Sequence, residues 1–374
     1  MSISDNNNNL RNSITSQGKK TKPKLEEFHV KQKSVVVKLK RFKGNPIISP
    51  KPQSSWESFA TTNPGAWYDE DTGKVTMLYR AAGNDPKHVI HFGLATSNDG
   101  FNFKRSAEPA FSPSENGMDA GCVEDPRIVK IGQYYYITYA SRAFAPGQYW
   151  LHEGQCYKPS GCPEEWPLCI RENLATSHLA ITKDFKTFTR VGMLTDPNLD
   201  DRDVFLFPEK VNGQFVMIHR PLQWCGEKFG SQHPAIWISK SDDLLGFRNS
   251  KLLAQAEYKW EHKIGGNTPP IKTAAGWLML YHAVGRDKYY RLGAMLLDLN
   301  DPSIVKHRTR DWIFQPEEDY ETNGCYFGGG VVFPCGAVVI DGELFVYYGA
   351  ADKYVGVATC KLDDILNYLL QCPV

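Results

Sequence analysis

One supersecondary unit recurs five times along this chain of 374 residues, and it constrains the fold more than any other feature. Each copy has a first strand, a turn, a second strand that ends in tyrosine or histidine, and a third strand with small residues, as in FGLAT, RLGAM and VGVAT. The second strands are expected at residues 74–79, 134–139, 215–219, 277–282 and 344–348. Their alternating or aromatic-rich patterns predict β-structure, and helical periodicity is almost absent after residue 45.

The spacing of the repeat predicts a closed β fold. Equivalent positions on the first strands are Asn63, Asp125, Asp203, Asn267 and Phe333, which lie 62, 78, 64 and 66 residues apart. The long second interval contains a cysteine- and proline-rich segment, residues 145–173. An antiparallel unit of this kind cannot bury its faces alone, so five copies predict an all-β, five-bladed β-propeller over residues 38–374. A sandwich or two ordinary β-domains are the alternatives.

The N-terminal residues are polar and have no apolar core for a signal peptide, so residues 1–37 are expected to form a disordered extension. The 43 lysines and arginines nearly balance the 42 aspartates and glutamates. This balance provides no basic face for nucleic acid or an anionic membrane. No window approaches the run of about 18 apolar residues that spans a membrane. The lysine-rich residues 31–43 leave homo-oligomerisation open.

The nine cysteines bear on the compartment. Because no secretory signal is visible, they predict mostly reduced thiols and a cytoplasmic location. Cys156, Cys162 and Cys169 crowd one segment, so a zinc or disulfide staple there is the alternative. Their spacing fits no standard zinc pattern.

The first strands and the ends of the second strands meet at a propeller's central funnel, where residues distant in sequence form one site. Neighbouring residues of a strand point to opposite faces, so only one of Glu124 and Asp125 is expected to face the funnel. No serine-nucleophile, zinc-protease or nucleotide-binding motif is present. The carboxylates, arginines, histidines and aromatic rings that remain suit a polyhydroxylated ligand. We expect no metal, because lone histidines are more often hydrogen-bonded structural groups.

Six stretches of the chain resemble glycoside hydrolase family 130, the inverting β-mannoside phosphorylases and β-mannosidases built on five-bladed propellers. They are NPGAWYDEDTGKVTMLYRA, EDPRIVKIGQYYYITYA, RDVFLFPEKVNGQFVMIHRP, NTPPIKTAAGWLMLYHAVG, YRLGAMLLDLNDPSIV and FPCGAVVIDGELFVYYGAADKYVGVAT. The resemblance covers residues 45–362 in order, and only the N-terminal extension and residues 145–173 stand outside it.

The resemblance implies residue roles. The family's general acid falls on Asp125, which would protonate the glycosidic oxygen through a sugar hydroxyl while attack comes from the opposite face. Positions that line the family's pocket fall on Asn63, Arg80, Arg127, Asp203, His219 and Tyr281. We expect substrate contacts also from Arg220, Lys263, Asn267, His282 and Asp352. No cofactor is expected, and inorganic phosphate is a co-substrate if the chain is a phosphorylase.

The nature of the attacking group is the open question. A phosphorylase needs converging basic groups, for which Arg80, Arg202, Lys210, His219, Arg220 and Lys263 are candidates. The family's phosphorylases usually carry an arginine where this chain has Ser177, so Arg142 or Arg171 would have to replace it. Glu209 and Glu261 are candidates for activating water instead.

We therefore expect an inverting glycosidase that acts on β-mannosides, above all β-1,2-linked manno-oligosaccharides. A β-mannoside phosphorylase that releases mannose 1-phosphate is the alternative. A related β-mannosyltransferase that uses a sugar nucleotide comes next, followed by a non-catalytic glycan-binding propeller.

Overall fold

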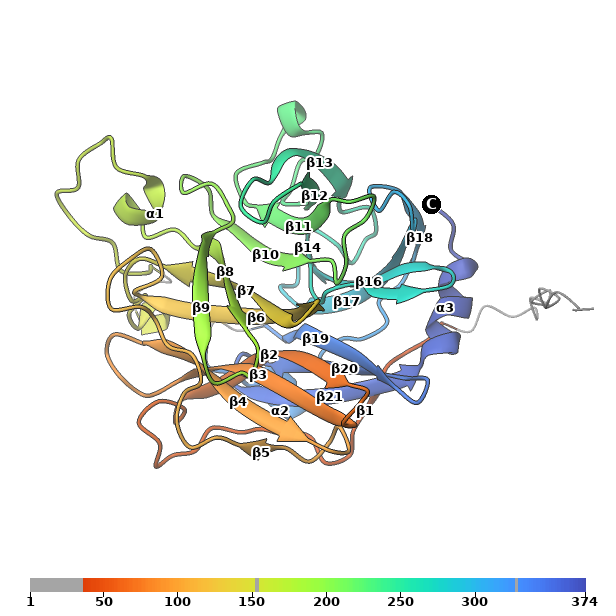
Figure 1. Ribbon diagram of the computed structural model, residues 1–374, viewed down its shortest axis with the longest axis horizontal. Coiled ribbons are helices and arrows are strands. Elements are labelled where there is room, and N and C mark those ends of the chain that lie inside the picture. Colours follow the sequence, from red (N-terminus) through yellow and green to blue (C-terminus); the bar gives the residue numbers. More distant parts are fainter. Residues whose placement is uncertain (1–35, 152–154, 327–328) are drawn as a thin grey trace, which may run out of the picture. The chain divides into compact units, whose positions relative to one another are not determined.

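The repeated strand pattern folds into five antiparallel sheets in the computed structural model, which describes residues 36–151, 155–326 and 329–374. The sheets are arranged as the blades of a five-bladed β-propeller (Figure 1), which confirms the predicted fold. The first blade has β2 (Ala60–Asp69), β3 (Lys74–Ala82), β4 (Ile90–Ser97) and β5 (Lys104–Arg105). The second has β6 (Cys122–Ile131), β7 (Tyr134–Arg142), β8 (Thr176–Thr182) and β9 (Phe188–Met193).

The remaining blades follow the same meander. The third has β10 (Asp201–Leu206), β11 (Phe215–Pro221), β12 (Ile236–Ser241) and β13 (Arg248–Ala254). The fourth has β14 (Lys263–Gly266), β15 (Ile271–Thr273), β16 (Gly276–Val284), β17 (Tyr290–Leu297) and β18 (Val305–Arg308). The fifth has β19 (Val332–Ile340), β20 (Glu343–Ala350) and β21 (Tyr354–Lys361). Glycine at positive φ closes first-to-second-strand turns, as at Gly132 (φ 62°) and Gly342 (φ 76°), as the turn signals predict.

The fifth blade is completed from the other end of the chain. Its outermost strand is β1 (Lys40–Arg41), which pairs antiparallel with β21 through Lys40 with Thr359 and Arg41 with Ala358. Figure 1 shows this orange-red strand beside the blue β21. The closure ties the ring together and covers a strand edge that would otherwise be open.

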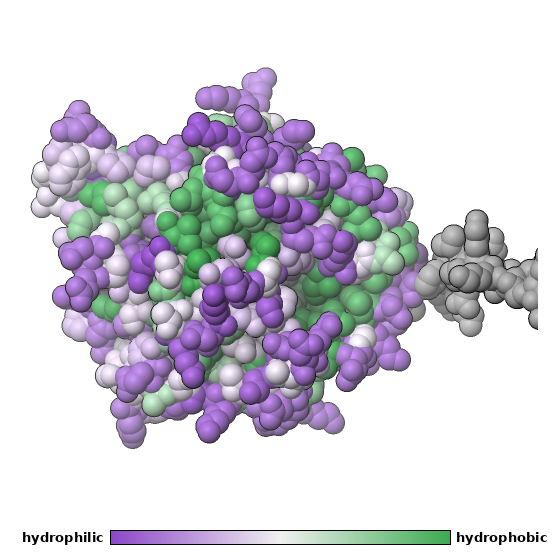
Figure 2. Space-filling model, in the orientation of Figure 1, coloured by the Kyte–Doolittle hydropathy of each residue, from purple (hydrophilic) through white to green (hydrophobic). Residues whose placement is uncertain are grey.

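Helices are short and peripheral. They are η1 (Tyr149–Leu151), α1 (Leu168–Arg171), η2 (Glu227–Phe229), α2 (Asp319–Thr322) and α3 (Leu362–Leu370). None of the helices in the described ranges is long and apolar enough to cross a membrane. Of the predicted N-terminal extension, residues 1–35 lie outside the described residues, and Val36 and Val37 pack against the core beside Leu39. Figure 2 shows hydrophilic residues over much of one face of the molecule, with apolar patches nearer its centre.

In each of four blades of the described structure, a buried tyrosine and a buried carboxylate meet an arginine. The triads are Tyr79–Glu57–Arg105, Tyr139–Asp119–Arg190, Tyr281–Glu261–Arg308 and Tyr348–Glu321–Arg41. In each, the tyrosine comes from the second strand, the acid from the segment before the first strand, and the arginine from the outermost strand. In the fourth blade Tyr281 donates to Glu261 at 2.8 Å and Arg308 donates to the same carboxylate at 2.8 Å. Burial raises the pKa of all four phenols, so they act as neutral donors.

The triads explain the small residues of the third strands. Gly93, Gly293 and Gly356 are the cross-strand partners of Tyr79, Tyr281 and Tyr348. A Cβ atom at any of these glycines would collide with the ring of its tyrosine. The tyrosine ring that lies over each of these positions therefore requires glycine. This contact explains why a glycine recurs in these third strands.

We expect Arg41→Met to lower the free energy of unfolding by about 3 kcal/mol, because it leaves the buried Glu321 carboxylate without its ion-pair partner. The Glu321 side chain is 0% exposed and Arg41 Nη2 lies 2.8 Å from Glu321 Oε2. Denaturant unfolding checks this, with Lys40→Met as the matched control on the exposed side of the same strand. Equal midpoints for the two variants would contradict a structural role for the triad.

Candidate active site

Three of the predicted first-strand positions have a left-handed backbone. Asn63, Asp125 and Asp203 have φ of 46°, 56° and 57°. Each lies where the register between the first two strands of its blade shifts by an extra residue. A bulge of this kind re-aims a side chain out of the sheet, and all three side chains line one pocket. In the fifth blade the shift falls between Pro334 and Gly336, just beyond the predicted Phe333.

The pocket has a volume of about 390 Å³ and is lined by residues of all five blades. Of the predicted site residues it brings together Asn63, Arg80, Asp125, Asp203, Arg220, Lys263, His282 and Asp352. Glu124 lines it as well, although only one of the two adjacent carboxylates was expected to face the funnel. The bulge is the reason, because it breaks the alternation of faces on which that expectation rested.

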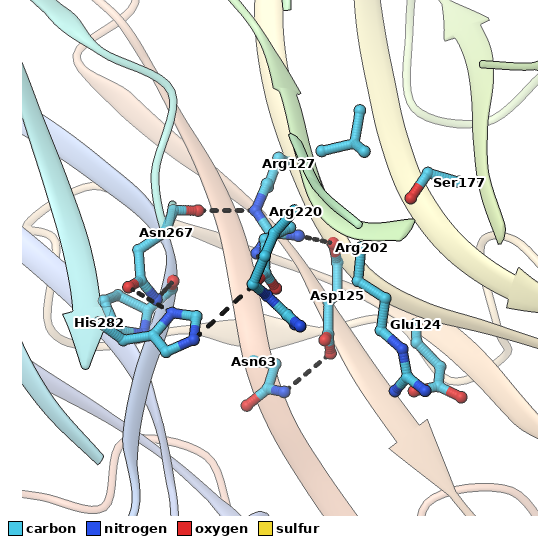
Figure 3. Close-up of polar contacts among 12 residues, drawn as sticks. Asn63, Glu124, Asp125, Arg127, Ser177, Arg202, Arg220, Asn267 and His282 are labelled. Atoms are coloured by element: carbon cyan, nitrogen blue, oxygen red, sulfur yellow. Dashed lines mark hydrogen bonds and ion pairs between the residues drawn. The ribbon is translucent and has the colours of Figure 1, made fainter. Parts of the chain in front are cut away.

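Asp125 is held in a polar network at one side of the pocket. Asn63 Nδ2 donates to Asp125 Oδ1 at 2.8 Å (Figure 3), and Arg80 Nη1 lies 3.4 Å from the same oxygen. Arg80 also pairs with Glu124 at 3.1 Å. Burial works against ionisation of Glu124, but Arg80, Arg142 and Arg202 lower its pKa to about 2. Glu124 is therefore ionised and is a counter-charge to Arg80 beside Asp125.

Asp352 is the third acid on this side of the pocket, after Glu124 and Asp125. Burial raises its pKa to about 6, and the nearby charges of Asp125 and Glu124 add to the shift against the effect of Arg80. A carboxyl group with this pKa can either donate to or accept from a sugar hydroxyl near neutral pH.

Four basic side chains line the pocket from the second, third and fourth blades, and we call them the anion site: Arg142, Arg202, Arg220 and Lys263. Arg202 forms a two-pronged pair with Asp200 at 2.7 Å, and Arg220 Nε lies 2.5 Å from Asp203 Oδ2. Arg220 Nη1 is buried and has no hydrogen-bond partner within the described chain. Burial, with the charge of Arg220, lowers the pKa of Lys263 to about 8. An unsatisfied buried donor among crowded cations fits an anionic ligand.

Four predicted residues support the pocket from behind rather than line it. Arg127 Nε donates to the Asn267 carbonyl at 2.6 Å, and Asn267 Oδ1 lies 3.1 Å from His282 Nδ1 (Figure 3). Arg127 Nη2 also lies 3.5 Å from Asp203 Oδ1. Tyr281 belongs to the fourth-blade triad. His219 takes the tyrosine position in the third blade and bonds Asp201 at 2.8 Å.

The two glutamates that were predicted to activate water, Glu209 and Glu261, do not line the pocket. The side chain of Glu209 is 48% exposed and pairs with Lys272 at 2.5 Å. Glu261 is the acid of the fourth-blade triad, where Tyr281 and Arg308 hold it. Lys210, a candidate for phosphate, lies over the ring of Phe215 outside the pocket. Proximity to a first strand in sequence does not show which way a side chain points.

Sequence reasoning missed several lining residues. They are Pro146, Tyr149, Cys156, Leu222, Tyr290, Tyr326 and Val331. One feature of the sequence indicated some of them: the cysteine- and proline-rich segment 145–173, which contains Pro146, Tyr149 and Cys156. All nine cysteines are free thiols, so no disulfide staples that segment. Within the described residues, no group of three or more histidine, cysteine, aspartate and glutamate side chains is arranged to hold a metal ion.

Residues 29–152 and 170–371 match the model of one enzyme family, Glyco_hydro_130, described as β-1,4-mannooligosaccharide phosphorylase. The chain belongs to glycoside hydrolase family 130. It is 37% identical over 338 residues to the 1,2-β-oligomannan phosphorylase of Thermoanaerobacter sp. strain X514, covering 88% of this chain and 99% of that one. The β-1,2-mannobiose phosphorylase of the same strain is 36% identical over 341 residues, with the same coverage of 88% and 99%.

Solved structures agree with this family 130 assignment. The β-1,2-mannobiose phosphorylase from Listeria innocua, in complex with β-1,2-mannobiose, superposes with a TM-score of 0.72 and 28% identity. The match covers 89% of this chain and 99% of that one.

We expect inorganic phosphate to raise the melting temperature of this family 130 protein. At a phosphate concentration of 100 times the dissociation constant, binding adds about 2.7 kcal/mol of stability. Arg220→Met should lose most of this shift, because it removes the unsatisfied donor of the anion site, whereas Lys210→Met should keep it. A full shift in the Arg220 variant, measured by thermal denaturation, would show that the anion binds elsewhere.

Proposed function

We propose that this family 130 enzyme is a β-1,2-mannoside phosphorylase. It transfers the terminal mannosyl unit of a β-1,2-linked manno-oligosaccharide to inorganic phosphate and releases mannose 1-phosphate. The observation that supports this most directly is the anion site of Arg142, Arg202, Arg220 and Lys263 in the same pocket as Asp125. Both relatives that are more than 35% identical are named as phosphorylases of β-1,2-linked mannosides.

The structure favours phosphorolysis over the hydrolysis that we expected. A hydrolase needs a carboxylate base for water, and the two glutamates that we expected in that role, Glu209 and Glu261, are held outside the pocket. Arg142, one of the two candidates to substitute for the arginine that the family's phosphorylases usually carry at the Ser177 position, lines the pocket from the end of β7. Arg171, the other candidate, does not line the pocket and donates to the carbonyl of Glu164.

The proposed reaction uses one acid from the protein and one nucleophile from solution. Asp125 gives a proton through a sugar hydroxyl to the glycosidic oxygen, and the bond between that oxygen and C1 breaks. A phosphate oxygen forms the new bond to C1 from the opposite face, so the β-mannoside yields α-mannose 1-phosphate. Phosphate loses its proton to solvent, from which Asp125 is reprotonated. The anion site holds phosphate in line, while Asn63 and Arg80 orient Asp125.

We place the enzyme in the cytoplasm as part of this proposal. Its nine cysteines are all free thiols, and such a set is typical of proteins kept in a reducing compartment.

Asp125→Asn should lower kcat by at least about 100-fold, because a general acid contributes 10²–10⁴ to the rate. Folding and sugar binding should be retained, since an amide replaces the carboxyl without a change in size. Melting temperature and mannobiose binding by calorimetry provide the controls. A variant with near-normal turnover would remove Asp125 from the acid role.

Product analysis tests the attacking group. The wild-type enzyme is incubated with β-1,2-mannobiose and with β-1,4-mannobiose, each with and without phosphate. Mannose 1-phosphate should form from the β-1,2-linked substrate only when phosphate is present. Mannose released in phosphate-free buffer would establish a hydrolase instead. Transfer from GDP-mannose without breakdown of either disaccharide would establish a mannosyltransferase.

The KM for phosphate should rise with pH above about 8. The pKa of Lys263 is lowered to about 8 by burial, so its charge is lost as pH rises through that value. Binding of an anion then requires a proton to be taken up, which weakens affinity by up to about tenfold per pH unit. Lys263→Arg should remove this dependence, because arginine stays charged. Lys210→Arg is the control, and an unchanged profile in Lys263→Arg would exclude Lys263 from phosphate binding.

A further inference from the structure

One wall of the pocket comes from a segment within which the match to the family model is interrupted. The match stops at residue 152 and resumes at residue 170, within the segment 145–173, here called the insertion. Pro146, Tyr149 and Cys156 of the insertion line the pocket. Figure 1 shows the insertion in yellow-green near α1, reaching out beyond the second blade. Pro146 and Tyr149 lie at the end of the first matched range, and Cys156 lies in the part that the family model skips.

The insertion begins in the second blade and makes stacking contacts with the first and the fifth. The Tyr149 ring stacks on Tyr326, which precedes β19, with centroids 5.4 Å apart and an interplanar angle of 24°. Trp150 stacks on Phe59, which precedes β2, at 4.9 Å and 19°. His88 Nε2 lies 2.8 Å from the Tyr326 hydroxyl and connects the two stacks. We call the Tyr149–Tyr326 stack the aromatic wall.

Hydrogen bonds at the base of the insertion hold the aromatic wall in place. Asn173 is 0% exposed, and its Nδ2 donates to the carbonyls of Phe144 and Tyr157, both at 2.9 Å. The amide of Gly147 donates to the carbonyl of Lys87 at 2.9 Å. The Arg142 guanidinium donates to the carbonyl of Asn173. These hydrogen bonds fix the insertion, and with it the aromatic wall, to the first and second blades.

The aromatic wall lies on the same side of the pocket as the catalytic acid. The Arg80 guanidinium, which pairs with Glu124 and Asp125, is 5.8 Å from the centroid of the Tyr326 ring. Asp125 passes its proton through one sugar hydroxyl to the oxygen that stays with the leaving sugar, so that oxygen lies within one hydroxyl group of Asp125. Phosphate attacks from the other face of the mannosyl unit, so the leaving sugar has to lie beside Asp125, Arg80 and the wall.

We propose that the aromatic wall closes the leaving-group side of the pocket after one sugar, so that this enzyme prefers disaccharides to longer β-mannosides. The inference rests on the proposed phosphorylase function and adds the chain length that it selects. A cavity of about 390 Å³ is near the small end of the 300–1,000 Å³ typical of ligand sites. The two Thermoanaerobacter relatives are named for oligomannan and for mannobiose, so relatedness alone leaves chain length open.

The test compares kcat/KM for β-1,2-mannobiose, mannotriose and mannotetraose at saturating phosphate. Wild type should favour the disaccharide by about tenfold, and Tyr149→Ala should raise the trisaccharide-to-disaccharide ratio by about tenfold. Tyr157→Ala is the matched control, because this tyrosine lies in the same insertion but is 53% exposed and does not line the pocket. An unchanged ratio in Tyr149→Ala, or a wild type that prefers the longer substrates, would overturn the inference.

A second measurement leaves Tyr149 in place. In the Asp125→Asn variant, mannobiose with phosphate should slow alkylation of Cys156 by iodoacetamide, since Cys156 lines the pocket, and leave Cys162 unaffected. Peptide mass spectrometry follows both thiols. Equal labelling of Cys156 with and without ligands would show that the insertion does not bound the sugar site. If wild type forms no mannose 1-phosphate from any substrate, the proposed function fails and the inference fails with it; turnover with unchanged ratios removes the inference alone.

Discussion

The pairing of a buried carboxylate with a tyrosine and an arginine is the interaction on which the rest of this propeller depends. Each of the four triads joins the segment before the first strand, the second strand and the outermost strand of a blade, so one carboxylate, through its ion pair and its tyrosine hydrogen bond, holds three chain segments together. A buried charge is tolerated only when it is paired and hydrogen-bonded. In the fifth blade the arginine is Arg41, so the same interaction also fastens the strand that closes the ring.

This frame allows backbone strain at the pocket. Asn63, Asp125 and Asp203 all adopt left-handed φ in bulges of otherwise regular sheets, a conformation that persists only where the surroundings enforce it. The bulges bring two carboxylates of consecutive residues, Glu124 and Asp125, to one cavity. The site then divides into two sides. In the proposed reaction, Asp125 with Arg80 acts on the leaving sugar, and the anion site from the second, third and fourth blades binds phosphate.

Much of this could be predicted from residues and their spacing. The recurring glycine turns and small third-strand residues predicted five blades, because turn geometry and the tyrosine–glycine contact are local and repeat in sequence. Asp125 stood out through its motif, and the pocket includes it. Glu261 and Tyr281 were expected in the funnel, yet they bond each other and Arg308 in the blade interior. A carboxylate near a strand end has the same sequence signature in a pocket and in a triad.

The sequence by itself determined the blade repeat and the motif that contains Asp125, since each depends on residues near one another in the chain, and the five repeats predicted a closed all-β fold. Only the tertiary structure decided that β1 completes the fifth blade, that Arg142 joins the anion site, and that Tyr149 stacks on Tyr326 in one wall of the pocket. These contacts join residues far apart in sequence, such as Arg41 and Glu321. They form only when the blades close into a ring, and no pattern of neighbouring residues in the sequence predicts them.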